Sequence, residues 1–166
     1  MLNFDFHNPT HIAFGKGRVA DLAKLVPAAA KVLILVGGAS AEKTGTLAEV
    51  RAALGGRSHA TFSGIEPNPS YETSMKAVAQ IREGGFDFLL AVGGGSVIDA
   101  VKFIAAAVKF EGDPWAILEK FGRNVKGALP FGAVLTLPAT GSEMNNGGVI
   151  THRAKGAKLP FSSVHT

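Results

Sequence analysis

The chain has 166 residues, of which 46% are hydrophobic and 18% charged, so it fits one globular domain with a real core and is not intrinsically disordered. Its net charge is +4 without a dense basic cluster, which argues against a nucleic-acid partner, and it has no cysteine, which excludes disulfides and thiolate metal sites. It has no apolar run of membrane-spanning length and no signal-peptide pattern, so we expect a cytoplasmic protein without a membrane partner.

Strands and helices alternate along the chain. In the first half of the chain, the pattern predicts a strand at 9–15, a helix at 17–26, a strand at 32–36, a helix at 43–54 and a short strand at 59–63. It then predicts a helix from Ser70 to about Glu83, a strand at 86–92 and a helix with one apolar stripe over 97–108. A short helix from Asp113-Pro114 to Phe121, a strand at 133–137 and a last strand at 149–151 follow. Residues 158–161 show no clear periodicity.

This order predicts an α/β fold with a mostly parallel sheet and helices on both faces. Ligands of such sheets bind beyond the carboxyl ends of the strands. Three turns rich in glycine or threonine, at residues 37–40, 93–96 and 138–142, each follow a predicted strand. We therefore expect these turns to converge on one ligand site.

The turn Gly93-Gly94-Gly95-Ser96 joins a buried strand to a helix. Backbone N–H groups and a helix N-terminus meet there, which favours phosphate, and glycine lets a pyrophosphate approach or allows a positive φ. The turn is neither a Walker A loop nor a G-x-G-x-x-G fingerprint, so an ATPase is not expected. The alternative is a helix-entry turn that binds nothing.

Polar side chains near these turns allow two interpretations each. Asp99 and Lys102 fit an ordinary ion pair on a helix, or they reach the polar end of a ligand. The hydroxyls of Thr136, Thr140 and Ser142 can cap a helix or bind phosphate and amide groups.

The turn Gly37-Gly38-Ala39-Ser40 has no carboxylate to bind a ribose 2′-hydroxyl, which favours NADP over NAD. The five histidines lack metal-ligand spacing, so we expect them to be surface or structural residues. The residues therefore predict a cofactor site, but no catalytic residue and no metal ligand.

Four segments, at residues 9–17, 66–69, 93–102 and 137–143, resemble the iron-containing (group III) alcohol dehydrogenases in the same order. Within that family they look nearest to the NADPH-dependent aldehyde reductases and butanol dehydrogenases. The resemblance implies a dinucleotide-binding domain of the dehydroquinate synthase-like kind. It also implies a helical domain in which one aspartate and three histidines hold a divalent metal, iron or zinc.

The resemblance also implies roles for individual residues. Gly94, Gly95 and Ser96, beside Gly93, would hold the pyrophosphate, and Asp99 would lie near the nicotinamide. The other residues implied to line the cofactor site are Gly37, Gly38, Ser40, Thr136, Leu137, Thr140, Ser142, Asn145 and Lys158.

By the same resemblance, residues 1–166 correspond to the dinucleotide-binding domain, and we expect the helical metal-binding domain to be absent from this chain. The complete enzyme is expected to move a hydride between NADP(H) and an alcohol–aldehyde pair as a homodimer, with residues 1–15 at the dimer contact. We expect this chain alone to bind cofactor weakly without turnover. The alternatives are a non-catalytic nucleotide-binding domain and a related enzyme such as a glycerol dehydrogenase or a dehydroquinate synthase.

Overall fold

A computed structural model describes residues 3, 5 and 7–166. The strands are β1 (Val32–Val36), β2 (His59–Phe62), β3 (Phe88–Gly94), β4 (Phe131–Leu137), β5 (Gly147–His152) and β6 (Ala157–Ser162). The α-helices are α1 (Leu22–Leu25), α2 (Ser40–Lys43), α3 (Thr46–Leu54), α4 (Tyr71–Gly84), α5 (Gly95–Lys109) and α6 (Trp115–Glu119). Two 3-10 turns, η1 (Arg18–Asp21) and η2 (Ser142–Met144), complete the elements.

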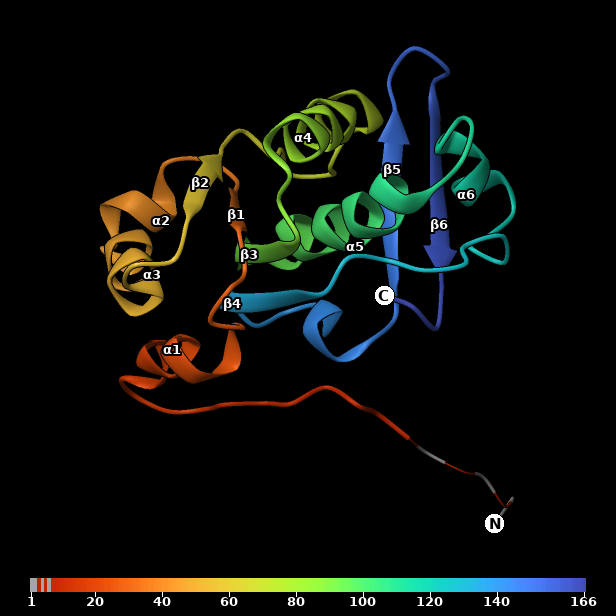
Figure 1. Cartoon of the computed structure of the whole chain (residues 1–166). Coiled ribbons are helices and arrows are strands. Elements are labelled where there is room, and N and C mark those ends of the chain that lie inside the picture. The colour runs from red at the N-terminus through yellow and green to blue at the C-terminus, as the bar shows by residue number, and fades with distance from the viewer. Residues whose placement is uncertain (1–2, 4, 6) are drawn as a thin grey trace.

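The main sheet is parallel throughout and has the order β2-β1-β3-β4. Helices α1, α2 and α3 cover one face, and α4 and α5 cover the other (Figure 1). Because successive side chains of a strand point to opposite faces, Leu33 and Leu35 join one core while Val32, Ile34 and Val36 join the other. The predicted fold class is confirmed.

Strands β5 and β6 form a separate antiparallel hairpin that packs on α5 and α6 (Figure 1). At Gly148 an added Cβ would lie 3.2 Å from Cα of Asp99, so the hairpin backbone lies directly on the helix. The predicted strand at 149–151 is confirmed within β5. Its partner β6 covers residues 158–161, for which no strand was predicted, and Leu159 and Phe161 point inward there.

Three predicted elements differ in the structure. The strand predicted at 9–15 does not form, because these residues join neither sheet and leave Ile12 and Phe14 51% and 93% exposed. The helix predicted at 17–26 is η1 followed by the short α1. The helix predicted at 43–54 begins later, as α3 at Thr46, because Gly45 takes a left-handed conformation with φ of 78°, and the separate short helix α2 precedes it.

Strand β4 was predicted to be buried but forms an edge of the sheet. Its residues are only half-buried or exposed, and Leu137 at its end is 65% exposed. Strand β4 therefore pairs with β3 on one side only, and the residues at its carboxyl end are exposed.

Capping predictions hold at two helices. The backbone N–H of Thr73 donates to Oγ of Ser70 at 3.1 Å, and that of Trp115 donates to Oδ1 of Asp113 at 2.9 Å.

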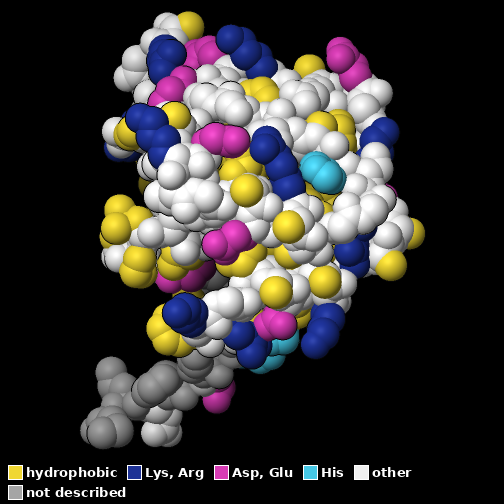
Figure 2. All heavy atoms as spheres, turned by 90° about the vertical axis from the view of Figure 1, so that its left-hand side faces the viewer, with side chains coloured by type: hydrophobic (Ala, Val, Ile, Leu, Met, Phe, Trp, Pro, Cys, Tyr) yellow, Lys and Arg dark blue, Asp and Glu magenta, His cyan; other side chains and the backbone are white. Residues whose placement is uncertain are grey.

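In the part of the chain that the structure describes, no helix has the length and apolar character needed to cross a membrane. On the face with β2, α2 and α3, basic side chains are interspersed with acidic ones (Figure 2).

Candidate cofactor site

The three predicted turns lie side by side at one edge of the main sheet. Val36 at the end of β1 is in register with Val92 of β3, and Gly94 of β3 is in register with Leu137 of β4. The side chain of Val97, in the first turn of α5, lies beneath both glycine turns: its Cγ2 would be 3.5 Å from a Cβ on Gly37 and 2.6 Å from one on Gly93. The turns therefore lie together as predicted, and their convergence on one ligand stays a prediction.

Crowding, and not a positive φ, distinguishes Gly93 and Gly95 of the glycine turn. Residues 93–95 have ordinary backbone angles, in contrast to the alternative that such a turn needs φ above zero. A Cβ on Gly95 would collide with the hydroxyl of Thr140 and lie 3.1 Å from that of Ser142. At Gly94, by contrast, a Cβ would meet only Leu137, at 3.8 Å.

Gly94 is therefore the open point of the turn. It is the N-cap of α5, a helix of 15 residues whose first N–H groups have no partner within the helix. Ser96 follows in the first turn of that helix and is half-buried. Open backbone, N–H groups and the positive end of a helix dipole together suit a phosphate group.

A hollow of about 370 Å³ lies beyond the end of β1. It is lined by Val36, Gly37, Gly38, Ala39, Ala41, Glu42, Leu47, Ser63 and Gly64. Ser40 is the first residue of α2 and is exposed beside it. The hollow is mostly apolar and adjoins the glycine turn through Val97, so it suits the adenosine end of a dinucleotide.

Glu42 is a candidate site residue that the sequence did not point to. The turn 37–40 itself has no carboxylate, but α2 brings Glu42 to the wall of the hollow. Its Oε1 lies 3.7 Å from Nη1 of Arg51, and Nη2 of Arg51 donates to the hydroxyl of Thr61 at 3.3 Å. An acidic residue two positions after the turn was the available signal.

The third wall consists of β4 and the segment after it. Thr136 and Leu137 are exposed at the end of β4, and the hydroxyl of Thr140 lies 2.8 Å from that of Ser142. Ser142 is 4% exposed, while Thr140 faces solvent. The two hydroxyls lie against Gly95 of the glycine turn, and their predicted role in binding phosphate stays a prediction.

Asp99 and Lys102 do not form the ion pair that one interpretation offered. Oδ2 of Asp99 accepts the backbone N–H of Val149 at 3.2 Å, so this carboxylate holds β5 on α5. Lys102 is buried and donates to the segment around Asn145. Burial lowers the pKa of Lys102 to about 8, and the carboxylates of Asp99 and Glu143 oppose that shift.

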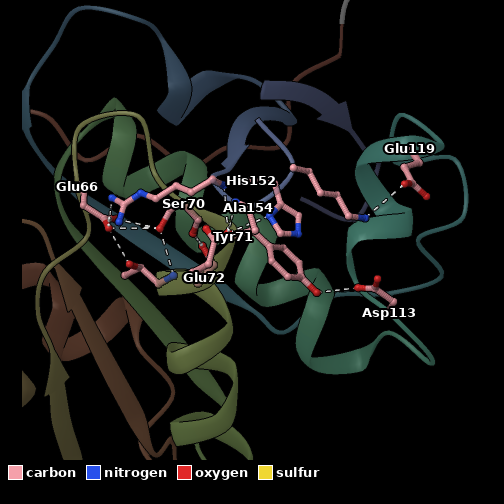
Figure 3. A network of polar contacts seen from close by, with 12 residues as sticks. Glu66, Ser70, Tyr71, Glu72, Asp113, Glu119, His152 and Ala154 are labelled. Carbon is pink, nitrogen blue, oxygen red and sulfur yellow. Dashed lines mark hydrogen bonds and ion pairs between the residues drawn. The ribbon is translucent and has the colours of Figure 1, made fainter. Parts of the chain in front are cut away.

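A network of polar contacts fixes the β5–β6 turn between α4 and α6 (Figure 3). Nδ1 of His152 lies 2.8 Å from Oε1 of Glu72, and the His152 ring stacks on Tyr71 with 4.8 Å between ring centroids. Nη2 of Arg153 donates to Oε1 of Glu66 at 2.8 Å. Oε2 of Glu72 is buried without a hydrogen-bond partner, and Nδ1 of His152 approaches Glu72 without the geometry of a hydrogen bond. The backbone N–H groups of Arg153 and Ala154 donate to Glu72 of α4, and Lys155 pairs with Glu119 of α6, so we assign the network to holding the hairpin in place.

The hairpin also carries Lys158, whose Nζ donates to Oδ1 of Asn68 at 2.7 Å. Lys158 therefore lies against the turn at 66–69, and its predicted contact with a cofactor stays a prediction. Within residues 3, 5 and 7–166, no group of three or more His, Cys, Asp or Glu side chains is arranged to hold a metal ion. The described residues do not fit a metal centre.

Comparison with known proteins relates this site to a family. The model of the family described as iron-containing alcohol dehydrogenase matches residues 9–166. NADPH-dependent aldehyde reductase YqhD of Escherichia coli strain K12 is 54% identical over 99% of this chain and 43% of its own length. Probable NADH-dependent butanol dehydrogenase 1 of Bacillus subtilis strain 168 is 49% identical over 92% of this chain and 40% of its own.

Solved structures agree with this relation. The crystal structure of E. coli YqhD superposes with a TM-score of 0.96 at 54% identity, over 98% of this chain and 42% of the other. NADH-dependent butanol dehydrogenase A of Thermotoga maritima gives a TM-score of 0.92 at 38% identity, over 98% and 42%. The chain thus spans less than half the length of these relatives.

Proposed function

Because the chain belongs to the iron-containing alcohol dehydrogenase family, we propose that it is the NADP(H)-binding part of an oxidoreductase that transfers a hydride between NADP(H) and an alcohol–aldehyde pair. The observation that carries the proposal is the open backbone at Gly94, whose neighbours Gly93 and Gly95 are both crowded, the first by Val97 and the second by Thr140 and Ser142. The bound cofactor would supply the hydride, and the chain would bind and orient it.

The residues divide the work of binding between them. The N–H groups at 94–96 would donate to the pyrophosphate, and the hydroxyls of Thr140 and Ser142 would extend the same surface. The hollow at 37–42 would take the adenosine end. The resemblance places the nicotinamide near Asp99, which is beyond the glycine turn along α5.

Glu42 makes NADH a second candidate cofactor. A carboxylate beside the adenosine ribose favours two hydroxyls and repels a 2′-phosphate, and Glu42 lines the hollow. Arg51 offsets part of this charge from 3.7 Å. One relative is named as NADPH-dependent and another as NADH-dependent, so identity alone does not choose between them.

Isothermal titration of the 166-residue chain with NADPH and with NADH tests the proposal. We expect both to bind, with NADPH tighter. A Gly95→Asp variant should abolish binding, because its side chain would enter the space of Thr140. Gly56→Asp is the matched control, since a Cβ on Gly56 meets nothing within 4 Å. A folded chain that binds neither dinucleotide would overturn the proposal.

The alcohol or aldehyde substrate, the homodimer and the cytoplasmic location remain predictions of the same proposal. Turnover by the chain alone is not expected, since the described residues offer no metal centre and Asp99, the carboxylate near the proposed nicotinamide position, already accepts the N–H of Val149. Assaying the chain with NADPH and a short aldehyde checks this. Reduction at an enzymatic rate would show that the catalytic groups lie within this chain.

A further inference from the structure

Lys102 is a cation buried in the core of the molecule. It lies on α5, two turns after the glycine turn, and only 2% of its surface is exposed. Lysine is almost never this buried without partners, because removing an ammonium group from water is costly. No ion pair among the described residues includes Lys102.

Three neutral oxygens take the place of a carboxylate. Nζ of Lys102 donates to the carbonyl oxygen of Asn145 at 2.6 Å, to Oδ1 of Asn145 at 2.8 Å and to the carbonyl oxygen of Gly147 at 2.8 Å. An ammonium group has three protons, so each has its own acceptor. Two of the acceptors belong to Asn145, in the short connection between η2 and β5, and the third belongs to Gly147, the first residue of β5.

Asn145 transmits this anchor to the third wall of the site. Its Nδ2 donates to the carbonyl oxygen of Gly141 at 2.9 Å, and its Oδ1 also accepts the N–H of Gly147 at 3.0 Å. Gly141 lies between Thr140 and Ser142, whose hydroxyls contact Gly95. Every polar atom of the Asn145 side chain is therefore used to fix residues 140–147.

We propose that Lys102 and Asn145 are positioning residues, which hold the segment 140–147 against α5 and thereby set the hydroxyls of Thr140 and Ser142 at the glycine turn. The proposal rests on the proposed function in one respect, namely that these hydroxyls face a cofactor phosphate. Binding of the pyrophosphate then depends on the buried lysine, whereas binding of the adenosine end in the hollow at 37–42 does not.

The first test needs no cofactor and uses hydrogen–deuterium exchange of the 166-residue chain. In Lys102→Met, which is unbranched and shorter by one atom and removes the charge, we expect peptides within 140–147 to exchange at least tenfold faster. Exchange in β3 should stay unchanged. Lys109→Met is the matched control, because Lys109 is an exposed lysine in the last turn of the same helix. Unchanged exchange of 140–147 in Lys102→Met would overturn the proposal.

The second test separates the two ends of the cofactor. Titration calorimetry with NADPH should show at least tenfold weaker binding to Lys102→Met. Binding of adenosine 2′-monophosphate, followed by NMR shifts of Gly37 and Gly38, should change less than twofold. A general loss of stability would weaken both ligands alike, and that result, or unchanged NADPH binding, would refute the positioning role.

A second variant covers the case in which Lys102→Met does not fold. Asn145→Ala leaves two backbone acceptors for Lys102 but removes the bond to Gly141, so we expect faster exchange at 140–142 and weaker NADPH binding in the same direction. If the parent chain binds no NADPH, the proposed function fails, while the exchange experiment still decides whether Lys102 and Asn145 hold the segment.

Discussion

Gly94→Ala is the sharpest probe of the phosphate site, because the change should alter binding without altering the fold. Gly94 has φ of −89° and ψ of −170°, which alanine adopts without strain, and its new methyl would make an ordinary contact with Leu137 at 3.8 Å. Alanine is a poorer N-cap than glycine, which destabilises the fold, but it also makes the unfolded chain less flexible, which stabilises the fold. The free energy of unfolding should therefore change by less than about 1 kcal/mol.

The same methyl would stand where a phosphate is proposed to approach the backbone. We expect the NADPH dissociation constant of Gly94→Ala to rise at least tenfold, which corresponds to about 1.4 kcal/mol. Urea unfolding gives the stability and titration calorimetry gives the affinity. If a folded Gly94→Ala variant binds NADPH as tightly as the parent, the phosphate does not approach Gly94 and the assignment of the site is wrong.

Gly93→Ala is the matched comparison, one residue away. Its methyl would lie 2.6 Å from Cγ2 of Val97 inside the core, and such overpacking costs about 1–3 kcal/mol. In a chain of this size each kcal/mol lowers the melting temperature by roughly 2–4 °C. An unchanged melting temperature for Gly93→Ala would show that the crowding described beneath the turn is wrong.

Three further changes test other parts of the structure. Glu42→Gln removes a carboxylate from the hollow, so the ratio of NADPH to NADH affinity should rise by about threefold at low salt. If calorimetry gives an unchanged ratio, Glu42 has no role in choosing between the two cofactors. Lys102 has a pKa of about 8 when folded and 10.5 as its ordinary value, so between those pH values the unfolded chain binds more protons. Stability should therefore rise with pH there, by at most about 1.4 kcal/mol per pH unit relative to Lys102→Met, in urea melts. The Tyr71 hydroxyl donates to Asp113 at 2.6 Å and lowers the pKa of that carboxyl. Tyr71→Phe should therefore lower the free energy of unfolding by about 1 kcal/mol at pH 7. Thermal melts should show this difference shrinking as the pH falls through the folded pKa of Asp113.

The main sheet and the grouping of its glycine turns at one edge could be predicted because their signals are local. Residues 32–36 and 88–92 are continuous apolar runs that stop at glycines, and the intervening helices have one apolar face. Ser70 and Asp113 likewise predict where their helices begin, because each side chain caps a backbone N–H only two or three residues further on. Parallel strands put their carboxyl ends at one edge, so convergence of the turns followed from the order of elements.

The remainder depends on contacts between distant residues. Residues 9–14 have the composition of a strand but pair with no strand in the part of the chain that the structure describes. Strand β6 does alternate, with Leu159 and Phe161 inward, but Pro160 obscures that pattern. The partners of Lys102 lie more than forty residues away, and nothing in the spacing of Asp99 and Lys102 distinguishes a surface ion pair from a buried anchor.

The order β2-β1-β3-β4 has a consequence for how the chain folds. Strand β1 is buried on both faces, yet its second neighbour β3 is made only after β2 and α4. Parallel pairing between distant segments closes long loops and is intrinsically slow, so a partly synthesised chain exposes the apolar residues of β1 for an extended time. A nascent chain of this protein should therefore depend on chaperones until β3 emerges from the ribosome, after which the sheet can close around β1.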